Sequence, residues 1–173
     1  MARLTLGDPA PPFDLPAVDG QTRSLEDYEG LPVAVVFSCC HCPYVVAWED
    51  RLNGAARDYE GRAGLVAVNS NAGYLGDSFE DMRERATEKG FVFPFLSDES
   101  QDVARAYGAA RTPEVFLFDE DHRLAYHGAP DSDYADEEGA EPWLRQALDS
   151  VLAGEAPPLA ETPPVGCSIK WDA

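Results

Sequence analysis

Basic side chains are scarce in this sequence, and lysine is almost missing. Lys89 and Lys170 are its lysines, and 13 Lys and Arg residues face 32 Asp and Glu residues, which gives a formal net charge of -19 at pH 7. The phosphates of nucleic acids and anionic lipid surfaces repel a chain of this charge at long range. We therefore expect neither nucleic acid nor a membrane surface among its partners.

Long apolar runs are also missing. No stretch of the sequence approaches the roughly 20 apolar residues that a membrane-spanning helix requires. Met1–Ala10 does not show a basic region followed by a long apolar stretch, the pattern of a secretory signal. We therefore expect a cytoplasmic location.

The acidic residues are spread along the whole chain, with one denser patch. The patch consists of Asp131, Asp133, Asp136, Glu137, Glu138 and Glu141. Interspersed carboxylates keep a surface hydrated, and at high salt the self-repulsion between them is screened. We interpret this distribution of acidic residues as a device for solubility and hypothesise a halophilic source; the alternative is an ordinary acidic protein.

Length and composition predict one domain. A chain of 173 residues with 45% hydrophobic content is large enough to bury a core without covalent staples. We expect a domain over residues 1–153 and a proline-rich tail over residues 154–173 that packs on the same domain. The prolines of this tail are Pro157, Pro158, Pro163 and Pro164.

The 4 cysteines are too few, and too unevenly placed, to be a disulfide scaffold. Cys39, Cys40 and Cys42 lie within four residues, and Cys167 lies in the tail. In a reducing compartment such thiols have a catalytic or metal-binding role more often than a structural one.

The thiol cluster lies at a predicted turn from a strand to a helix. The apolar run Val33–Phe37 shows no polar alternation, which is typical of a parallel strand buried on both faces. In Pro43–Tyr59 apolar residues recur every three or four positions, which predicts an amphipathic helix with Pro43 in its first turn. A C-x-x-C motif in this context is typical of thioredoxin-like redox sites, because the helix N-terminus stabilises a thiolate.

The rest of the chain continues as alternating strands and helices. We predict strands at Leu65–Val68, Val115–Phe118 and Arg123–His127, and helices at Ser78–Gly90, Gln101–Tyr107 and Pro142–Leu152. The last two strands form one antiparallel hairpin in an otherwise parallel pattern. The expected fold is α/β and thioredoxin-like, with a central mixed sheet, helices on both faces and an extended C-terminal tail.

Thr112 and Pro113 immediately precede the strand at Val115–Phe118. A thioredoxin-like fold places a cis-proline at this position, opposite the redox turn, where the backbone before it is open to an extended substrate chain. We therefore expect Pro113 to be cis, with the Thr112–Pro113 bond opposite the redox turn and Thr112 as an auxiliary residue.

With these motifs in place, the chain resembles the thioredoxin-fold superfamily that includes peroxiredoxins, and within it the peroxiredoxin-like group of the alkyl hydroperoxide reductase and thiol-specific antioxidant (AhpC/TSA) family. The resemblance covers nearly the whole chain. The stretches that carry it are Phe37–Val45 (FSCCHCPYV), Val68–Asn71 (VNSN), Phe95–Tyr107 (FLSDESQDVARAY), Thr112–Phe118 (TPEVFLF) and Gly166–Trp171 (GCSIKW). It implies that Cys39 and Cys42 form the redox pair and that Pro113 is the cis-proline.

The chain departs from the pattern of this group at two positions. Members usually carry a cysteine just before Thr-Pro, where this chain has Arg111, and an asparagine or similar residue in place of Cys40. The missing cysteine removes one resolving partner. Arg111 either stabilises a thiolate or a bound anion, or is an ordinary surface side chain.

The residues leave open which thiol attacks first. In a thioredoxin Cys39, at the exposed start of the turn, would be the nucleophile and Cys42 the resolving thiol. In a peroxiredoxin Cys42, in the first helical turn, would meet a peroxide and form a sulfenic acid. Peroxiredoxins carry a threonine three residues before this cysteine, where this chain has Cys39. The cysteine at that position favours the dithiol mechanism.

Neighbouring residues have auxiliary or structural interpretations. His41 either favours the thiolate when protonated or is merely exposed, and Cys40 is interpreted as a small apolar side chain. Cys167 is either a resolving thiol or a packed tail residue. Ile169 and Trp171 are expected to anchor the tail by burial.

We therefore expect an enzyme, a thiol-disulfide oxidoreductase with a Cys39-x-x-Cys42 redox pair and no cofactor. Its partners would be a thiol reductant or a disulfide-bearing protein. One alternative is a thiol peroxidase with Cys42 as the peroxidatic cysteine. The other is a metal-binding module, which would need a remote ligand such as Cys167, because four consecutive residues cannot surround one ion. The oligomeric state is left open.

Overall fold

The computed structural model describes residues 3–71 and 73–172. Residues 1, 2, 72 and 173 of the predicted domain and tail lie outside the described residues. The strands are β1 (Asp14–Pro16), β2 (Thr22–Ser24), β3 (Val33–Ser38), β4 (Gly64–Asn69), β5 (Phe95–Ser97), β6 (Arg111–Thr112), β7 (Glu114–Phe118), β8 (Leu124–Gly128) and β9 (Cys167–Ser168). The helices are α1 (Pro43–Asp58), α2 (Phe79–Lys89), α3 (Asp102–Tyr107), α4 (Trp143–Leu152) and the short 3-10 helix η1 (Leu25–Tyr28).

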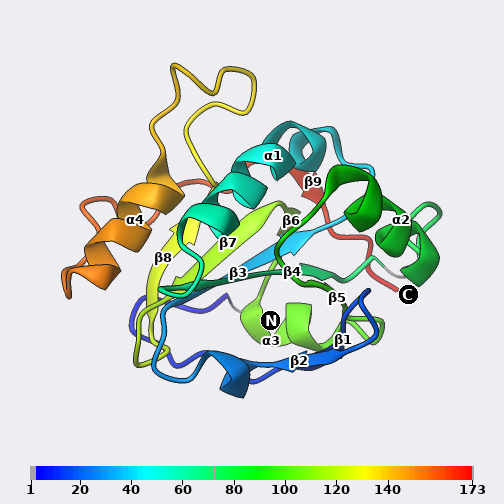
Figure 1. Cartoon of the computed structure of the whole chain (residues 1–173), viewed down its shortest axis with the longest axis horizontal. Helices are drawn as coiled ribbons and strands as arrows, with labels where there is room; N and C mark the ends of the chain where they lie inside the picture. The colour runs from blue at the N-terminus through cyan, green and yellow to red at the C-terminus, as the bar shows by residue number, and fades with distance from the viewer. Residues whose placement is uncertain (1–2, 72, 173) are drawn as a thin grey trace.

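A central five-stranded sheet has the order β5-β4-β3-β7-β8. Helices α1, α2 and α4 lie on one face, and α3 with the β1–β2 hairpin lies on the other (Figure 1). Every residue of β3 is buried, because both faces of the sheet are covered. The predicted mixed sheet with helices on both faces is confirmed.

The predicted direction of one strand is wrong. β3 is parallel to β4, and β4 is parallel to β5, but β7 is antiparallel to β3 as well as to β8. The antiparallel part of the sheet therefore extends beyond the predicted hairpin. An apolar run reports burial on both faces and not strand direction, and so the sequence pattern of β3 and β7 could not distinguish the two arrangements.

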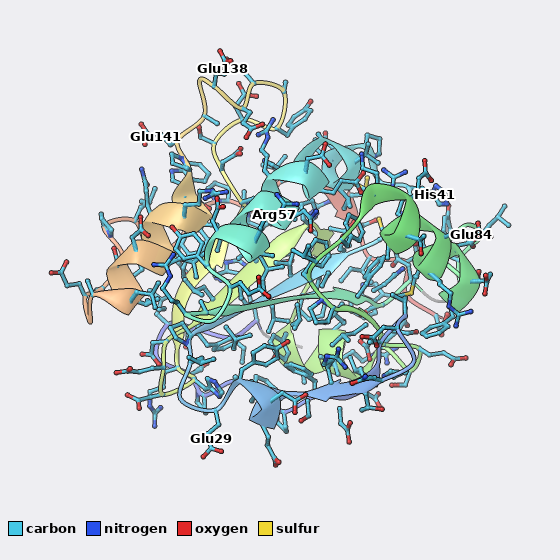
Figure 2. All side chains as sticks on the ribbon, viewed as in Figure 1. Glu29, His41, Arg57, Glu84, Glu138 and Glu141 are labelled. Atoms are coloured by element: carbon cyan, nitrogen blue, oxygen red, sulfur yellow. The ribbon has the colours of Figure 1, made fainter. Side chains whose placement is uncertain are left out.

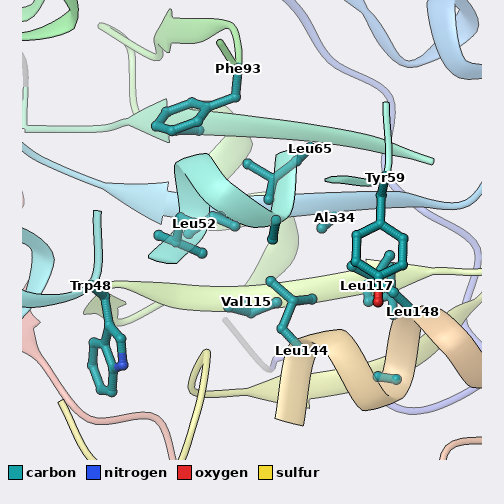
Figure 3. Close-up of a cluster of buried hydrophobic side chains, with 14 of the residues drawn as sticks. Ala34, Trp48, Leu52, Tyr59, Leu65, Phe93, Val115, Leu117, Leu144 and Leu148 are labelled. Carbon is teal, nitrogen blue, oxygen red and sulfur yellow. The ribbon is translucent and has the colours of Figure 1, made fainter. Parts of the chain in front are cut away.

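The larger core cluster lies between the sheet and α1, α2 and α4. Helix α1 contributes Trp48 and Leu52, α4 contributes Leu144 and Leu148, and the sheet contributes residues such as Val115 (Figure 3). This packing fixes the start of α1 relative to the end of β3. The turn that carries the thiols is therefore held from both sides by core contacts.

Helix boundaries follow from local chemistry. Pro43 occupies the first turn of α1, where its missing N–H has no helical partner. Ser78 caps α2, because its hydroxyl oxygen accepts a hydrogen bond from Asp81 N at 3.1 Å. The Asp81 carboxylate in turn accepts a hydrogen bond from Ser78 N. Gly90 ends α2 in the left-handed conformation with φ of 64°.

One member of the acidic patch has a structural role that the patch alone did not indicate. Asp131 is buried, accepts a hydrogen bond from Trp48 Nε1 at 2.8 Å and pairs with Arg51 at 2.7 Å. Glu138 and Glu141 lie on the loop that extends away from the sheet (Figure 2). The interpretation of the acidic residues as a device for solubility therefore does not hold for Asp131, which is buried.

No helix in residues 3–71 and 73–172 combines the length and the apolar character that crossing a membrane requires.

Candidate active site

The thiol cluster occupies the turn between β3 and α1, as the sequence indicates. Cys42 is the N-cap residue of α1, so that its backbone directly precedes the first helical turn. Cys39 and Cys42 are each only 5% exposed, and they pack together with Val45. The expectation that Cys39 is exposed at the start of the turn is wrong, because Thr112 and the neighbouring thiols cover it.

Thr112 lies against both sulfurs of the C-x-x-C motif. Its hydroxyl oxygen is 3.6 Å from Cys39 Sγ, and its carbonyl oxygen accepts a hydrogen bond from Cys42 Sγ at 3.3 Å. The Thr112–Pro113 peptide bond is cis. The structure thus brings four of the sequence-predicted site residues together, namely Cys39, Cys42, Thr112 and Pro113.

The tail adds a third thiol to this cluster. Cys167 Sγ lies 2.7 Å from Cys42 Sγ, and Cys167 packs against Cys39 and Cys42. Cys42 therefore has a thiol on either side of it, one from the turn and one from the tail.

The contacts of Cys42 favour its thiolate. Hydrogen bonds from the Cys39 thiol, and then from the Cys167 thiol and the Val45 N–H, lower the pKa of Cys42 to about 4, against the opposing effect of burial. The Thr112 carbonyl is the neighbour that favours the protonated form, because a carbonyl only accepts hydrogen bonds. Because the hydrogen-bond donors to Cys42 outnumber this one acceptor, the negative charge is held on Cys42.

The pKa values of the two neighbouring thiols, Cys39 and Cys167, are raised instead. The hydrogen bond that Cys39 donates to Cys42, together with burial, raises the pKa of Cys39. Burial, together with the hydrogen bond to Cys42, raises the pKa of Cys167 to about 11. The cluster holds one thiolate, on its central sulfur, flanked by two thiols that retain their protons.

Cys40 is separate from this cluster. Its side chain is buried in the core cluster with Trp48, as its interpretation as a small apolar side chain implies. Its backbone N–H donates to the Asp77 carboxylate at 2.7 Å, and Asp77 also accepts a hydrogen bond from Asn69 Nδ2 at 3.0 Å. Burial and the nearby carboxylate both raise the pKa of Cys40, which keeps it a thiol.

His41 and Arg111 lie at the edge of the site. His41 is exposed, and its ring covers Gly76, where an added Cβ would collide with it. Arg111 is exposed on β6, and its positive charge lowers the pKa of Cys167, although burial and Cys42 outweigh this effect. The structure therefore brings Arg111 near the tail thiol and leaves His41 turned toward the α2 side (Figure 2).

Sequence reasoning missed a buried ionisable pair, Glu114 and His127, beside the segment Ala110–Thr112. Glu114 is 1% exposed, and its carboxylate accepts hydrogen bonds from Ala110 N at 2.8 Å and Arg111 N at 2.9 Å. Its second oxygen is 2.6 Å from Nε2 of the buried His127, whose Nδ1 is 2.6 Å from Arg3. The available signal was an acidic residue at the start of an otherwise apolar strand, directly after Thr112–Pro113.

No group of three or more His, Cys, Asp or Glu residues in residues 3–71 and 73–172 is placed to hold a metal ion. No observation therefore favours the metal-binding alternative.

Comparison with known proteins places these features in context. A model described as the AhpC/TSA family matches residues 6–127. A Mycobacterium tuberculosis protein named "Putative peroxiredoxin MT2597" is 36% identical over 116 residues, which are 66% of this chain and 70% of that protein. The thiol-disulfide oxidoreductase ResA of Geobacillus thermodenitrificans is 27% identical over 121 residues, 70% of this chain and 67% of that protein.

Two solved structures show how far the fold is shared. An uncharacterized conserved protein from Geobacillus kaustophilus is 41% identical, with a TM-score of 0.91 over 97% of this chain and 93% of that chain. An exposed lipoprotein thioredoxin from Streptococcus pneumoniae is 22% identical, with a TM-score of 0.63 over 72% of this chain and 93% of that chain. The second likeness shows that the fold is that of thioredoxin.

Proposed function

The chain belongs to the AhpC/TSA family, and we propose that it is a thiol-disulfide oxidoreductase whose redox pair is Cys39 and Cys42. The observation that supports this most is the contact between the two thiols at the N-terminus of α1, with Thr112 against both sulfurs. Two thiols in contact form a disulfide without a large backbone movement. No cofactor is required for this chemistry.

Cys42 is the attacking thiol in this proposal, in contrast to the order expected from thioredoxins. Its lowered pKa makes it the thiolate at neutral pH, whereas the raised pKa of Cys39 keeps that residue protonated. The Cys42 thiolate attacks one sulfur of a substrate disulfide, forms a mixed disulfide and releases the other substrate sulfur as a thiolate. Cys39 then loses its proton to the released thiolate and attacks Cys42 Sγ.

This second step releases the remaining substrate sulfur as a thiolate, which takes up a proton from solvent, and leaves a Cys39–Cys42 disulfide. Two electrons pass from the enzyme to the substrate, and an external thiol reductant returns the pair to the reduced state. The proposed partners are therefore a disulfide-bearing protein and a thiol reductant. The proposed compartment is the cytoplasm, where reduced thiols persist.

Single-turnover experiments with a small disulfide test the assignment. Reduced protein is mixed with glutathione disulfide, quenched in acid and analysed by peptide mass spectrometry. Loss of reaction is expected for Cys42→Ser, whereas Cys39→Ser/Cys167→Ser still joins Cys42 to glutathione. Cys40→Ala is the matched control, since Cys40 lies in the core cluster. Unchanged disulfide consumption by Cys42→Ser would contradict the proposal.

A peroxidase activity is the second candidate, because the low pKa of Cys42 is also what a peroxidatic cysteine requires. Here the Cys42 thiolate attacks a hydroperoxide and becomes a sulfenic acid, and the displaced alkoxide or hydroxide takes up a proton from solvent to give an alcohol or water. Condensation with Cys39 then forms the disulfide and releases water. Stopped-flow mixing with hydrogen peroxide separates the candidates: a fast step that survives Cys39→Ser and is lost in Cys42→Ser favours the peroxidase.

A further inference from the structure

The C-terminal segment Gly166–Asp172 lies across the candidate site. Its strand β9 is antiparallel to β6, with Thr112 opposite Cys167 and Arg111 opposite Ser168. Ile169 N donates to Ala110 O at 3.0 Å and extends the pairing. Figure 1 shows β9 beside β6 near the start of α1. The backbone edge next to the redox thiols is therefore occupied by the protein's own tail.

The approach of the tail to this edge is close. A Cβ added at Gly166 would collide with the carbonyl group of Thr112. Glycine at this position thus allows the tail backbone to contact the loop that covers Cys39 and Cys42. This contact places the next residue, Cys167, with its sulfur 2.7 Å from Cys42 Sγ.

Beyond Cys167, buried polar groups dock the tail. The Gln101 side chain donates to Lys170 O at 2.8 Å and to Ser70 O at 2.7 Å, and accepts from Asp172 N at 3.0 Å. Asn71 accepts from Lys170 N at 2.9 Å. Gln101 is only 2% exposed and is held at a φ of 68°, a conformation that costs free energy for a residue with a side chain. The docking site for the tail is therefore built into the fold.

Of the two apolar side chains near the end of the tail, one is buried and one is exposed. Ile169 is 3% exposed and packs in the core cluster on the α3 face of the sheet, as expected. Trp171 is 45% exposed, so that the expectation of its burial is wrong. Its ring instead lies beneath the Arg105 guanidinium at 5.5 Å, because the tail leaves the core after Ile169.

We propose that Cys167 is a third redox residue, which competes with Cys39 for Cys42, and that its strand β9 occupies the edge on which an extended disulfide-bearing substrate pairs. The proposal rests on the proposed function, because the substrate disulfide is the oxidant. It adds a second internal disulfide, between Cys42 and Cys167, to the pair within the turn. It also assigns the tail a role as an internal competitor of the substrate.

The steps balance with the same substrate. Once Cys42 carries a mixed disulfide, the Cys167 sulfur attacks Cys42 Sγ, transfers its proton to the departing substrate thiolate and forms the Cys42–Cys167 disulfide. Cys39, after losing its proton to solvent, attacks the same Cys42 sulfur. This exchange forms Cys39–Cys42 and releases Cys167 as a thiolate that takes up a proton. No electrons beyond those of the first turnover are required.

Pairing at β6 explains why the tail and an extended substrate exclude one another. A peptide recognised by strand addition uses the backbone N–H and C=O groups of an open edge. At β6 those groups are already paired with β9. Substrate binding therefore requires β9 to leave, and the return of β9 brings Cys167 back to Cys42.

Disulfide trapping in the full chain tests whether Cys167 forms a disulfide with Cys42. Reduced Cys39→Ser is treated with glutathione disulfide, acid-quenched and mapped by peptide mass spectrometry. The expected product is the Cys42–Cys167 disulfide, whereas Cys39→Ser/Cys167→Ser accumulates Cys42 joined to glutathione. Cys39→Ser/Cys40→Ala, the matched control, should behave as Cys39→Ser does.

The outcomes separate the two proposals. If Cys39→Ser accumulates Cys42–glutathione while Cys167 stays reduced, the third redox residue is refuted and the proposed function stands. If glutathione joins Cys42 in neither variant, both are refuted.

A docking variant tests the role of the tail without removing a thiol. Gln101→Asn keeps an amide and a residue that tolerates positive φ, but is too short to reach Lys170 and Asp172. In the Cys39→Ser background we expect the ratio of Cys42–Cys167 to Cys42–glutathione to fall by about tenfold, given the hydrogen bonds lost. Trp171→Ala, on the exposed part of the tail, should shift the ratio in the same direction and leaves the core intact. An unchanged ratio in both variants, with native circular dichroism, would contradict tail docking.

Discussion

Removal of the Cys39 thiol should raise the pKa of Cys42. In the wild-type structure the donors to Cys42 Sγ are the Cys39 thiol, the Cys167 thiol and the backbone N–H groups of Val45 and Cys167, and together they lower its pKa to about 4. An ordinary cysteine titrates at about 8.5. The substitution Cys39→Ala deletes the contribution that is largest among these and leaves the helix N-terminus unchanged.

The magnitude follows from the energy of a hydrogen bond to a charged group. Such a bond contributes about 1.5–3 kcal/mol, and one pKa unit corresponds to about 1.4 kcal/mol. Cys39→Ala should therefore raise the pKa of Cys42 by about one to two units, and Cys39→Ala/Cys167→Ala by about two to four units. The double variant should still titrate below an ordinary thiol, because the backbone donor Val45 N remains.

The assay is the pH dependence of alkylation. Reduced protein is treated with iodoacetamide at a series of pH values, and modification of the Cys42 peptide is followed by mass spectrometry. Because only the thiolate reacts, a lowered pKa keeps the wild-type rate constant until the pH falls toward about 4. Cys40→Ala is the control and should titrate as wild type. A wild-type midpoint near that of a free thiol, or identical midpoints in all variants, would refute the reasoning.

Three further predictions concern stability. Glu114→Ala leaves His127 and two backbone N–H groups without their acceptor, so we expect a loss of about 3–5 kcal/mol in the free energy of unfolding, measured in urea; a loss below 1 kcal/mol would contradict the role of this pair. Asp77→Ala leaves the buried Cys40 N–H without an acceptor and should cost about 1–3 kcal/mol in the same assay, with slower reaction of Cys42; an unchanged stability would argue against it. If the acidic surface is an adaptation to salt, the thermal midpoint should rise from low to molar KCl, because screening removes repulsion within a chain of net charge -19; full stability without salt would refute the hypothesis.

The helices and the turn that carries the thiols could be predicted because their signals are local. Ser78, Asp81 and Gly90 define both ends of α2 within its own sequence, and Pro43 marks the start of α1. The juxtaposition of the C-x-x-C turn and Thr112 was expected from the thioredoxin-like pattern, and it arises because β7 is antiparallel to β3, so that the start of β7 lies beside the end of β3.

The parts that could not be predicted depend on contacts between distant residues. Strand β5 is only three residues long, and β9 exists because the tail pairs with β6. The partner of Glu114 is His127, which lies beside it because β7 and β8 are antiparallel. Composition and periodicity carry no record of such pairings.

The same limit applies to the order of attack. The spacing of Cys39 and Cys42 is compatible with either residue as the nucleophile. Two structural facts favour Cys42: its place between the thiols of Cys39 and Cys167, and its position as the N-cap of α1. The first of these depends on a residue far along the chain from Cys42.

The most direct test of the account is the identity of the first mixed disulfide. Reduced Cys39→Ser/Cys167→Ser and reduced Cys42→Ser are each mixed with one equivalent of glutathione disulfide, quenched in acid and mapped by mass spectrometry. The account predicts that glutathione is joined to Cys42 in the first protein and that Cys39 in the second stays largely reduced. Rapid attachment of glutathione to Cys39 in Cys42→Ser, with Cys42 unmodified in the first protein, would contradict it.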